Sequence, residues 1–212
     1  MIDTIFHVYN RGVEKRTIFL DDADRLRFIA SLVVFNSKDA TDPNAHRLME
    51  VSLPSLRHKK DEQLVELMVF CLMPNHYHLM LRPRTEHGLT EFMRKLGTGY
   101  TNYFNLRYDR VGSLFQGKFK SKPILTDAHF NWLPHYIHCN PFDGSETSII
   151  AYPWSSYKEY SAKSVPGQKH SSIVDMSFLS QWFETPEQFC QETADWLVQE
   201  NEESKHHELS LD

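Results

Sequence analysis

The sequence predicts an α+β fold in which one antiparallel sheet carries helices on one face. Short runs rich in β-branched and aromatic residues occur between longer segments whose apolar residues recur every three or four positions, as in amphipathic helices. Near the middle of the chain, two of the short runs are separated by Pro74 and Asn75, which predicts an antiparallel hairpin.

The first third of the chain contains one strand, one helix and a long irregular segment. The run IFHVY at residues 5–9 is ended by an Asn-Arg-Gly turn signal and predicts the first strand. Residues 21–35 begin with aspartates suited to a helix N-cap and then place apolar residues at helical spacing. Residues 37–63 show neither the helical nor the strand periodicity of apolar residues, so we expect an insertion or a long loop there.

The hairpin follows, with strands expected at residues 65–73 and 76–82. Residues 90–108 predict an amphipathic helix, because aromatic and apolar residues trace one stripe along it. Thr126 and Asp127 are good N-cap residues for a further helix that runs to about Cys139, before Pro141.

An extended run at residues 112–125 lies between the last two helices. Its lysines Lys118, Lys120 and Lys122 alternate with other residues, which predicts three ammonium groups on one face of a strand. This arrangement suits contact with a phosphate backbone. It equally suits an edge strand that lysines protect from pairing with another chain.

The predicted order is therefore β-α-β-β-α-β-α. Right-handed crossovers of this order give a ferredoxin-like βαββαβ antiparallel sheet with the first and third strands at its centre and helices on one face. We expect this domain to span residues 1–160, with the insertion at about 37–63. Residues 161–212 are expected to form an acidic C-terminal extension that is partly helical.

Charge is distributed unevenly along the 212 residues. The whole chain has 23 basic and 28 acidic residues, a net charge of -5. Residues 175–212 hold ten of the acidic residues and one basic residue, Lys205. The rest of the chain, with 22 basic and 18 acidic residues, is therefore positive by four charges. The acidic tail is either a solvated appendage or a segment that screens a basic surface.

Composition favours a cytoplasmic protein without a membrane span. Hydrophobic residues make up 41% and charged residues 24% of the chain, as in globular proteins. No apolar run approaches the ~20 residues of a membrane span. The three cysteines are far apart and form no CxxC pair, which suits a reducing compartment.

The candidate site begins with His76 and His78, two residues apart on a predicted strand. Side chains alternate along a strand, so both imidazoles lie on one face and can share one divalent cation. If the segment YIHCNP is helical, Tyr136 and Asn140 lie four residues apart on one helix face, so a phenol and an amide oxygen can face the same cation.

Six separated blocks of sequence together resemble one protein family. They are, in order, IFHVYNRG, FCLMPNHYHLML, KLGTGYTNYFNLRY, GSLFQGKFKS, HYIHCNP and YPWSSY. This order is similar to that of the REP-associated tyrosine transposases, which are related to the single-strand transposases of insertion sequences and belong to the HUH endonuclease class. The resemblance spans about residues 5–160.

The resemblance implies a role for each candidate residue. His76 and His78 match the two histidines of the HUH motif, and Tyr136 matches the catalytic tyrosine. Asn140 stands where relatives place a further polar metal ligand, often a glutamine. The implied cofactor is Mg²⁺ or Mn²⁺. The implied reaction is cleavage and rejoining of single-stranded or hairpin (REP-like) DNA through a 5′-phosphotyrosine, by a monomer or a homodimer.

Contacts to DNA are expected from two groups of residues. The first group lies at the end of the first strand and the second on the lysine-rich run; they are His7, Asn10, Arg11, Lys118, Lys120 and Lys122. Two other functions remain open: a catalytically silent protein that binds hairpin DNA, and a metal-dependent phosphoesterase that uses water in place of Tyr136 as the nucleophile.

Overall fold

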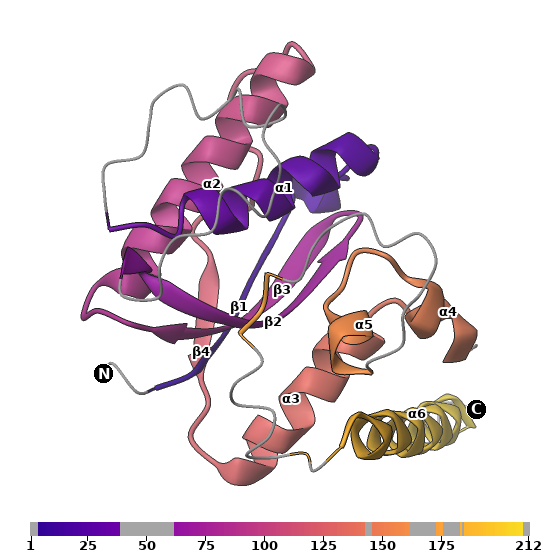
Figure 1. Cartoon of the computed structure of the whole chain (residues 1–212). Coiled ribbons are helices and arrows are strands. Elements are labelled where there is room, and N and C mark those ends of the chain that lie inside the picture. Colours follow the sequence, from indigo (N-terminus) through magenta and orange to yellow (C-terminus); the bar gives the residue numbers. More distant parts are fainter. Residues whose placement is uncertain are drawn as a thin grey trace.

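The computed structural model describes residues 4–38, 62–142, 146–161, 173–175, 183 and 185–209. These form one four-stranded antiparallel sheet with helices packed against it (Figure 1). The strands are β1 (Phe6–Arg11), β2 (Val65–Met73), β3 (His76–Pro83) and β4 (Lys120–Pro123). The helices are α1 (Asp22–Val34), α2 (Gly88–Arg107), α3 (Asp127–Cys139), α4 (Glu146–Ala151), α5 (Tyr157–Tyr160) and α6 (Pro186–Leu209), with a 3₁₀ turn at Val13–Lys15.

The sheet has the strand order β2-β3-β1-β4, so β1 and β3 are its central strands. This is the ferredoxin-like order that the sequence predicts. Both N-caps that the sequence indicates are present: Asp21 accepts a hydrogen bond from the backbone N–H of Asp24, and Thr126 accepts one from His129. The local capping signals therefore mark the starts of α1 and α3 correctly.

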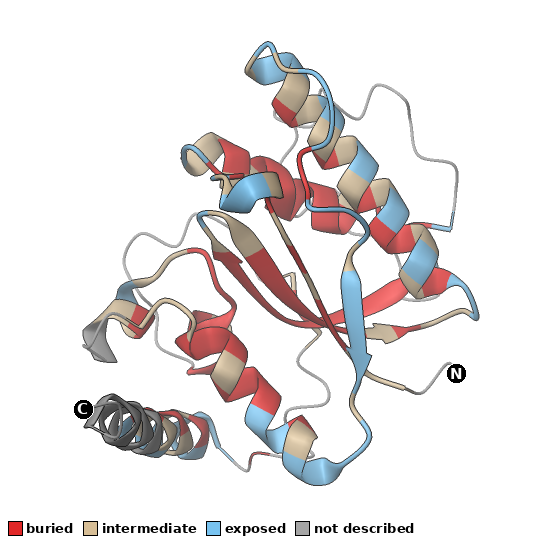
Figure 2. Ribbon diagram, turned by 180° about the vertical axis from the view of Figure 1, so that it is seen from behind, coloured by how far each residue is buried: buried red, intermediate tan, exposed pale blue. Residues whose placement is uncertain are grey.

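The two helices of the βαββαβ unit, α1 and α2, cover one face of the sheet (Figure 1). On that face the Tyr77 ring of β3 packs 5.0 Å from the Phe28 ring of α1. Helix α3 follows β4 and packs against β2 and β3 on the other face. Strand β2 is buried over almost its whole length, as a strand covered on both faces should be (Figure 2).

The lysine-rich run differs from its prediction. Strand β4 spans only Lys120–Pro123, and all four of its residues are exposed. Gly117 has φ +132°, a conformation that side-chain-bearing residues rarely adopt, so the extended run breaks just before Lys118. Lys120 and Lys122 pair with Tyr9 and His7 of β1, whereas Lys118 lies ahead of the strand. The expected row of three lysines on one strand face is therefore wrong for Lys118.

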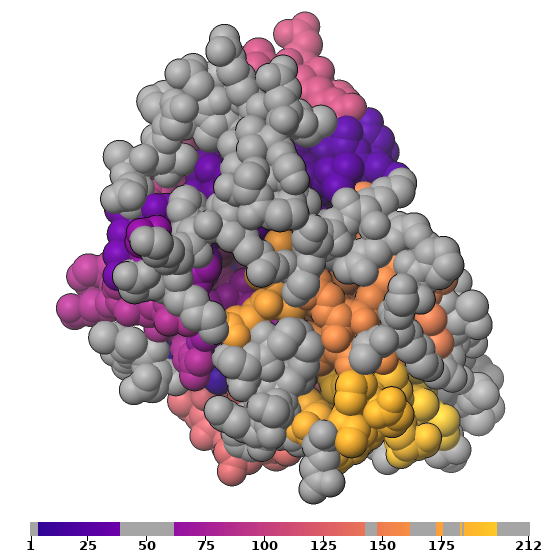
Figure 3. All heavy atoms as spheres, viewed as in Figure 1, coloured from indigo at the N-terminus to yellow at the C-terminus, as the bar shows by residue number. Residues whose placement is uncertain are grey.

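The C-terminal extension packs against α3 in its first part. Phe189 of α6 is buried, and its ring lies 4.7 Å from the ring of His135 on α3 and 5.0 Å from that of Tyr160 on α5. Figure 3 shows α5 and α6 side by side on the surface. This part of the acidic tail therefore supports the helix that carries the candidate site. Within the described residues, no helix is long and apolar enough to span a membrane.

A buried carboxylate ties α1 to α2. Asp24 is fully buried and accepts hydrogen bonds from the hydroxyls of Tyr103 and Tyr108 at 3.0 and 2.9 Å. It also pairs with Arg107 at 2.7 Å and accepts from the backbone N–H of Leu20. These partners satisfy the charge, so the network stabilises the fold only while it is complete.

Replacing Asp24 should therefore destabilise the protein strongly. We expect Asp24→Ala to lower the free energy of unfolding by roughly 3–5 kcal/mol, because it leaves Arg107 and two hydroxyls without their acceptor. Asp22→Ala is the matched control on the same helix turn. Its long ion pair with Arg25, at 3.9 Å and with the Asp22 carboxylate half exposed, should be worth less than about 1 kcal/mol. Urea denaturation of both variants measures the difference; equal losses would contradict this account.

Candidate functional site

The site lies on the sheet face that α3 covers. His76 and His78 of β3 stand opposite Arg11 and Tyr9 of β1. Directly opposed residues of an antiparallel pair point to the same face, so these four side chains share the α3 side of the sheet. The rings of His76 and His78 are 5.1 Å apart and nearly perpendicular. The structure thus brings the two predicted histidines together on one face.

Helix α3 adds the other two predicted residues. The half-buried ring of Tyr136 meets the His78 ring edge to face at 5.7 Å. On its other side it stacks on Trp132 one turn earlier, with ring centroids 4.6 Å apart and planes 19° apart. These contacts hold the phenol beside the histidines.

Asn140 is the C-cap residue of α3 and its side chain lies near His76: burial lowers the pKa of His76, and the neighbouring Asn140 side chain opposes this lowering. The amide nitrogen of Asn140 donates to the Tyr136 carbonyl at 2.9 Å, so its oxygen is the atom left to face His76. On the other side of the ring, His76 Nδ1 lies 2.6 Å from Oδ1 of Asn75. The Asn75 amide nitrogen in turn donates to the Lys15 carbonyl. His76 Nδ1 therefore carries the proton that it donates to Asn75.

This arrangement fits a divalent cation. A neutral His76 protonated on Nδ1 keeps a lone pair on Nε2, and the amide oxygen of Asn140 offers another; both are atoms that bind a divalent cation. Within the described ranges, no group of three or more His, Cys, Asp and Glu residues is placed to hold a metal. The candidate set is two imidazoles and one amide, which leaves coordination positions for phosphate oxygens or water.

Burial keeps the imidazoles of the site neutral. Desolvation is the largest cause that lowers the pKa of His78 to about 3, and the neighbouring His7 adds to it. Desolvation likewise lowers the pKa of His7 to about 4 and also lowers that of His76. Neutral imidazole is the form that binds a metal, so the site is ready for a cation near neutral pH.

His7 and Trp132 belong to this site in ways that sequence reasoning missed. The Nε2 atom of His7 lies 2.8 Å from Nδ1 of His78, and its ring meets Tyr136 edge to face at 5.9 Å. The predicted strand order could have indicated the first contact, since it makes the first and third strands neighbours. No feature of the sequence indicated that Trp132 would contact Tyr136.

The predicted DNA-contact residues divide between the two faces of the sheet. Arg11, Lys120 and Lys122 lie on the face of the candidate site, where both lysines are exposed. Asn10 points to the other face, where its amide nitrogen donates to the Gly117 carbonyl at 3.1 Å. The six predicted contact residues therefore do not lie on one surface.

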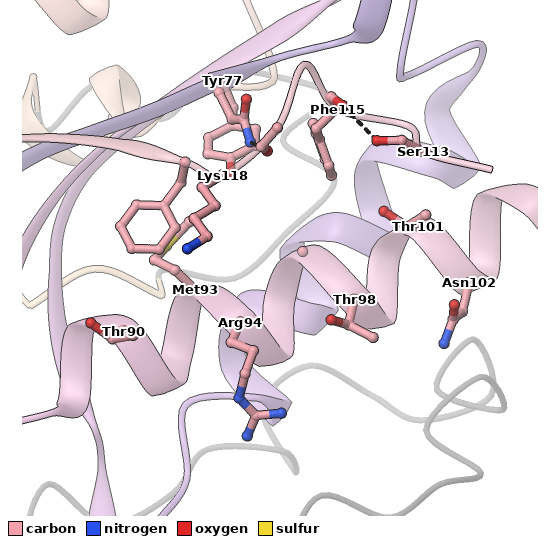
Figure 4. Close-up of a pocket in the computed structure, with 14 residues that line it drawn as sticks. Tyr77, Thr90, Met93, Arg94, Thr98, Thr101, Asn102, Ser113, Phe115 and Lys118 are labelled. Atoms are coloured by element: carbon pink, nitrogen blue, oxygen red, sulfur yellow. Dashed lines mark hydrogen bonds between the residues drawn. The ribbon is translucent and has the colours of Figure 1, made fainter.

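Asn10 and Lys118 instead line a cavity of about 550 Å³ between α2 and residues 113–119. Figure 4 shows Tyr77 and Phe115 on one side of this cavity and Met93 of α2 on the other, with Lys118 reaching across. Apolar side chains next to an exposed ammonium group suit a flat aromatic ligand that carries a negative charge.

Two further histidines of α3 face away from the site. His138 is fully buried and hydrogen-bonds to the Ser156 hydroxyl at 2.8 Å. His135 bonds to the Thr193 hydroxyl of α6 at 2.8 Å. Both fix the position of the helix and so of Tyr136.

Comparison with known proteins identifies relatives of the chain. Residues 42–140 match the family described as "Transposase IS200 like". No curated protein gives a significant match. Among solved structures, the chain is similar to one described as the "REP associates tyrosine transposase bound to a REP hairpin". The identity is 15% and the TM-score 0.49, over 83% of this chain and 90% of that one.

The contact between α3 and α6 should weaken in acid. Burial lowers the pKa of His135 to about 4 from an ordinary 6.5, so between these values the unfolded chain binds more protons than the folded one. The contribution of His135 to the free energy of unfolding is therefore fully present above about pH 6.5. It is lost as pH drops toward 4, which lowers the free energy of unfolding by up to about 3 kcal/mol.

Denaturation of the wild type and His135→Gln from pH 7.5 to 4 measures this contribution. The variant should lose less stability over that range. Glu192, whose carboxylate lies 3.6 Å from His135 Nε2, is the charged group that faces the ring, so Glu192→Gln serves as a second comparison. Parallel curves for wild type and His135→Gln would contradict this assignment.

Proposed function

We propose that this chain, whose residues 42–140 match the family described as "Transposase IS200 like", is a transposase of that kind: a metal-dependent single-strand DNA endonuclease and strand transferase that acts on hairpin DNA. The observation that supports it best is the position of Tyr136. Its ring contacts the His78 ring, while the side chain of Asn140 on the same helix lies near His76. The candidate nucleophile and the three candidate cation ligands are thus adjacent.

In this proposal His76, His78 and Asn140 bind Mg²⁺ or Mn²⁺. The cation would supply electrostatic stabilisation of the charge that develops on the scissile phosphate. The Tyr136 oxygen attacks phosphorus, loses its proton and expels a 3′-hydroxyl, which leaves a 5′-phosphotyrosine. Attack by another 3′-hydroxyl then reverses the bond exchange and rejoins DNA without ATP, because the phosphodiester energy is kept in the covalent intermediate.

The surfaces around the site support a single-stranded substrate. Arg11, Lys120 and Lys122 place positive charge on the catalytic face, where a flexible strand can lay its phosphates. The cavity beside Lys118 on the opposite face has the size and apolar lining to take one unpaired nucleotide, as would extend from a hairpin.

The proposed setting is a reducing cytoplasm, where the chain works as a monomer or a homodimer. Cys71, Cys139 and Cys190 are all free thiols, as that compartment favours.

Two alternative functions would use parts of the same site. A silent hairpin-binding protein would need the basic surfaces but not Tyr136. A phosphoesterase would need the histidines with a water nucleophile.

The proposed reaction predicts a covalent protein–DNA product. Purified protein incubated with labelled single-stranded hairpin DNA and Mg²⁺ or Mn²⁺ should give a band of protein size on a denaturing gel. Tyr136→Phe should abolish the band, since it removes the attacking oxygen. His76→Ala should reduce it by at least ~100-fold, because it removes a cation ligand.

Tyr152→Phe is the control, since this tyrosine donates its hydroxyl to the Leu72 carbonyl at the edge of β2. It should keep the covalent product. Cleavage that survives in Tyr136→Phe would favour the phosphoesterase. Binding without cleavage under either metal would favour the silent protein.

The lysines of β4 should contribute affinity that depends on salt but not on base sequence. Lys120→Gln with Lys122→Gln removes two phosphate contacts, so the slope of log affinity against log salt should fall by roughly 1.4 for a single strand. Lys38→Gln, which removes one positive charge elsewhere, is the control and should leave the slope unchanged, because Lys38 is exposed beyond the end of α1, the helix on the opposite face. Titration of labelled DNA by fluorescence anisotropy at several salt concentrations provides the slopes. An unchanged slope in the double variant would refute the contact.

A further inference from the structure

His7 of β1 contacts both a candidate metal ligand, His78, and the proposed nucleophile, Tyr136. Its Nε2 atom lies 2.8 Å from Nδ1 of His78, and the two rings are stacked with centroids 5.1 Å apart. The same ring meets Tyr136 edge to face at 5.9 Å. His7 is therefore placed to influence a metal ligand and the nucleophile together.

The hydrogen bond between His7 and His78 has two possible directions with opposite consequences. If His7 donates, the remaining proton of neutral His78 lies on Nε2, and that nitrogen cannot bind a cation. If Nδ1–H of His78 donates to Nε2 of His7, then Nε2 of His78 keeps its lone pair. Metal-binding histidines commonly donate their second ring N–H to a neighbouring acceptor in this way.

The neighbouring histidine already follows the second pattern. His76 donates from Nδ1 to the Oδ1 atom of Asn75, at 2.6 Å, and so offers Nε2 to a cation. The same arrangement in His78 would give both ligands the same tautomer. His7 would then accept a hydrogen bond from Nδ1–H of His78, as Asn75 accepts one from Nδ1–H of His76.

We propose that His7 is a positioning residue, which accepts a hydrogen bond from Nδ1–H of His78 and so makes Nε2 of His78 the metal-binding atom. This inference rests on the proposed function, since it assigns the ring nitrogen that the cation would use. It also gives His7 a role other than the predicted contact with DNA. The residue is only 7% exposed, so it offers a DNA strand little surface.

Three variants separate the hydrogen bond from ring packing. His7→Phe keeps an aromatic ring beside His78 and Tyr136 but has no acceptor. His7→Gln places an amide oxygen near the position of Nε2. Tyr9→Phe is the matched control, because the Tyr9 ring also stacks on His78, at 5.8 Å, and the variant keeps that ring.

The experiment reads the tautomer of His78 directly, by long-range ¹H–¹⁵N spectra of labelled protein with and without Mg²⁺. Calorimetric titration with Mn²⁺ then measures cation affinity. We expect Nδ1–H at His78 in the wild type, Tyr9→Phe and His7→Gln. In His7→Phe we expect a change to Nε2–H and a 10- to 100-fold loss of Mn²⁺ affinity.

Several results would overturn the proposal. One is Nε2–H at His78 in the Mg²⁺-loaded wild type; another is unchanged Mn²⁺ affinity in a folded His7→Phe. If His7→Phe does not fold, His7→Gln decides, since loss of the Nδ1–H form in that variant also counts against the proposal. A wild type that shows Nδ1–H but binds no cation would instead contradict the metal-dependent function and leave the hydrogen bond from His78 to His7 in place.

Discussion

The alternation of side chains along β3 is the constraint on which the rest of the structure depends. Tyr77 and Leu79 point into the core beneath α1 and α2, so His76 and His78 must point to the opposite face. A shift of one residue in the pairing of β3 would bury two imidazoles in an apolar core and remove the core aromatic ring. The hydrophobic core thus fixes the position of the candidate metal ligands.

Everything else at the site is positioned relative to that face. Pairing with β1 puts His7 next to His78, and α3 crosses the same face with Tyr136 and Asn140 one helical turn apart. Buried hydrogen bonds from the back of α3 hold this helix: His138 bonds to Ser156 and His135 to Thr193 of α6. An acidic tail that contributes no residue to the proposed chemistry therefore helps to hold the candidate nucleophile, Tyr136, in place.

Local signals predicted the fold well because each element carries its own pattern. The Pro-Asn hairpin, the caps at Asp21 and Thr126 and the alternation at His76 and His78 all act over a few residues, and the structure contains each of them. Two other features were harder to predict, because one depends on an unusual backbone conformation and the other on a non-local contact. The break before Lys118 depends on the backbone of Gly117, and the contact between His7 and His78 depends on the pairing of two strands about 70 residues apart in sequence. The insertion at 37–63 falls mostly outside the described residues.

The central claim is that the Tyr136 oxygen attacks phosphorus and keeps the 5′ end of the cut strand. Mass spectrometry of the covalent product, digested with protease and nuclease, tests this claim directly. The account predicts a nucleotide joined through its 5′-phosphate to the peptide that contains Tyr136. A nucleotide on another residue, a 3′-linkage, or cleaved DNA with no peptide attached would contradict it.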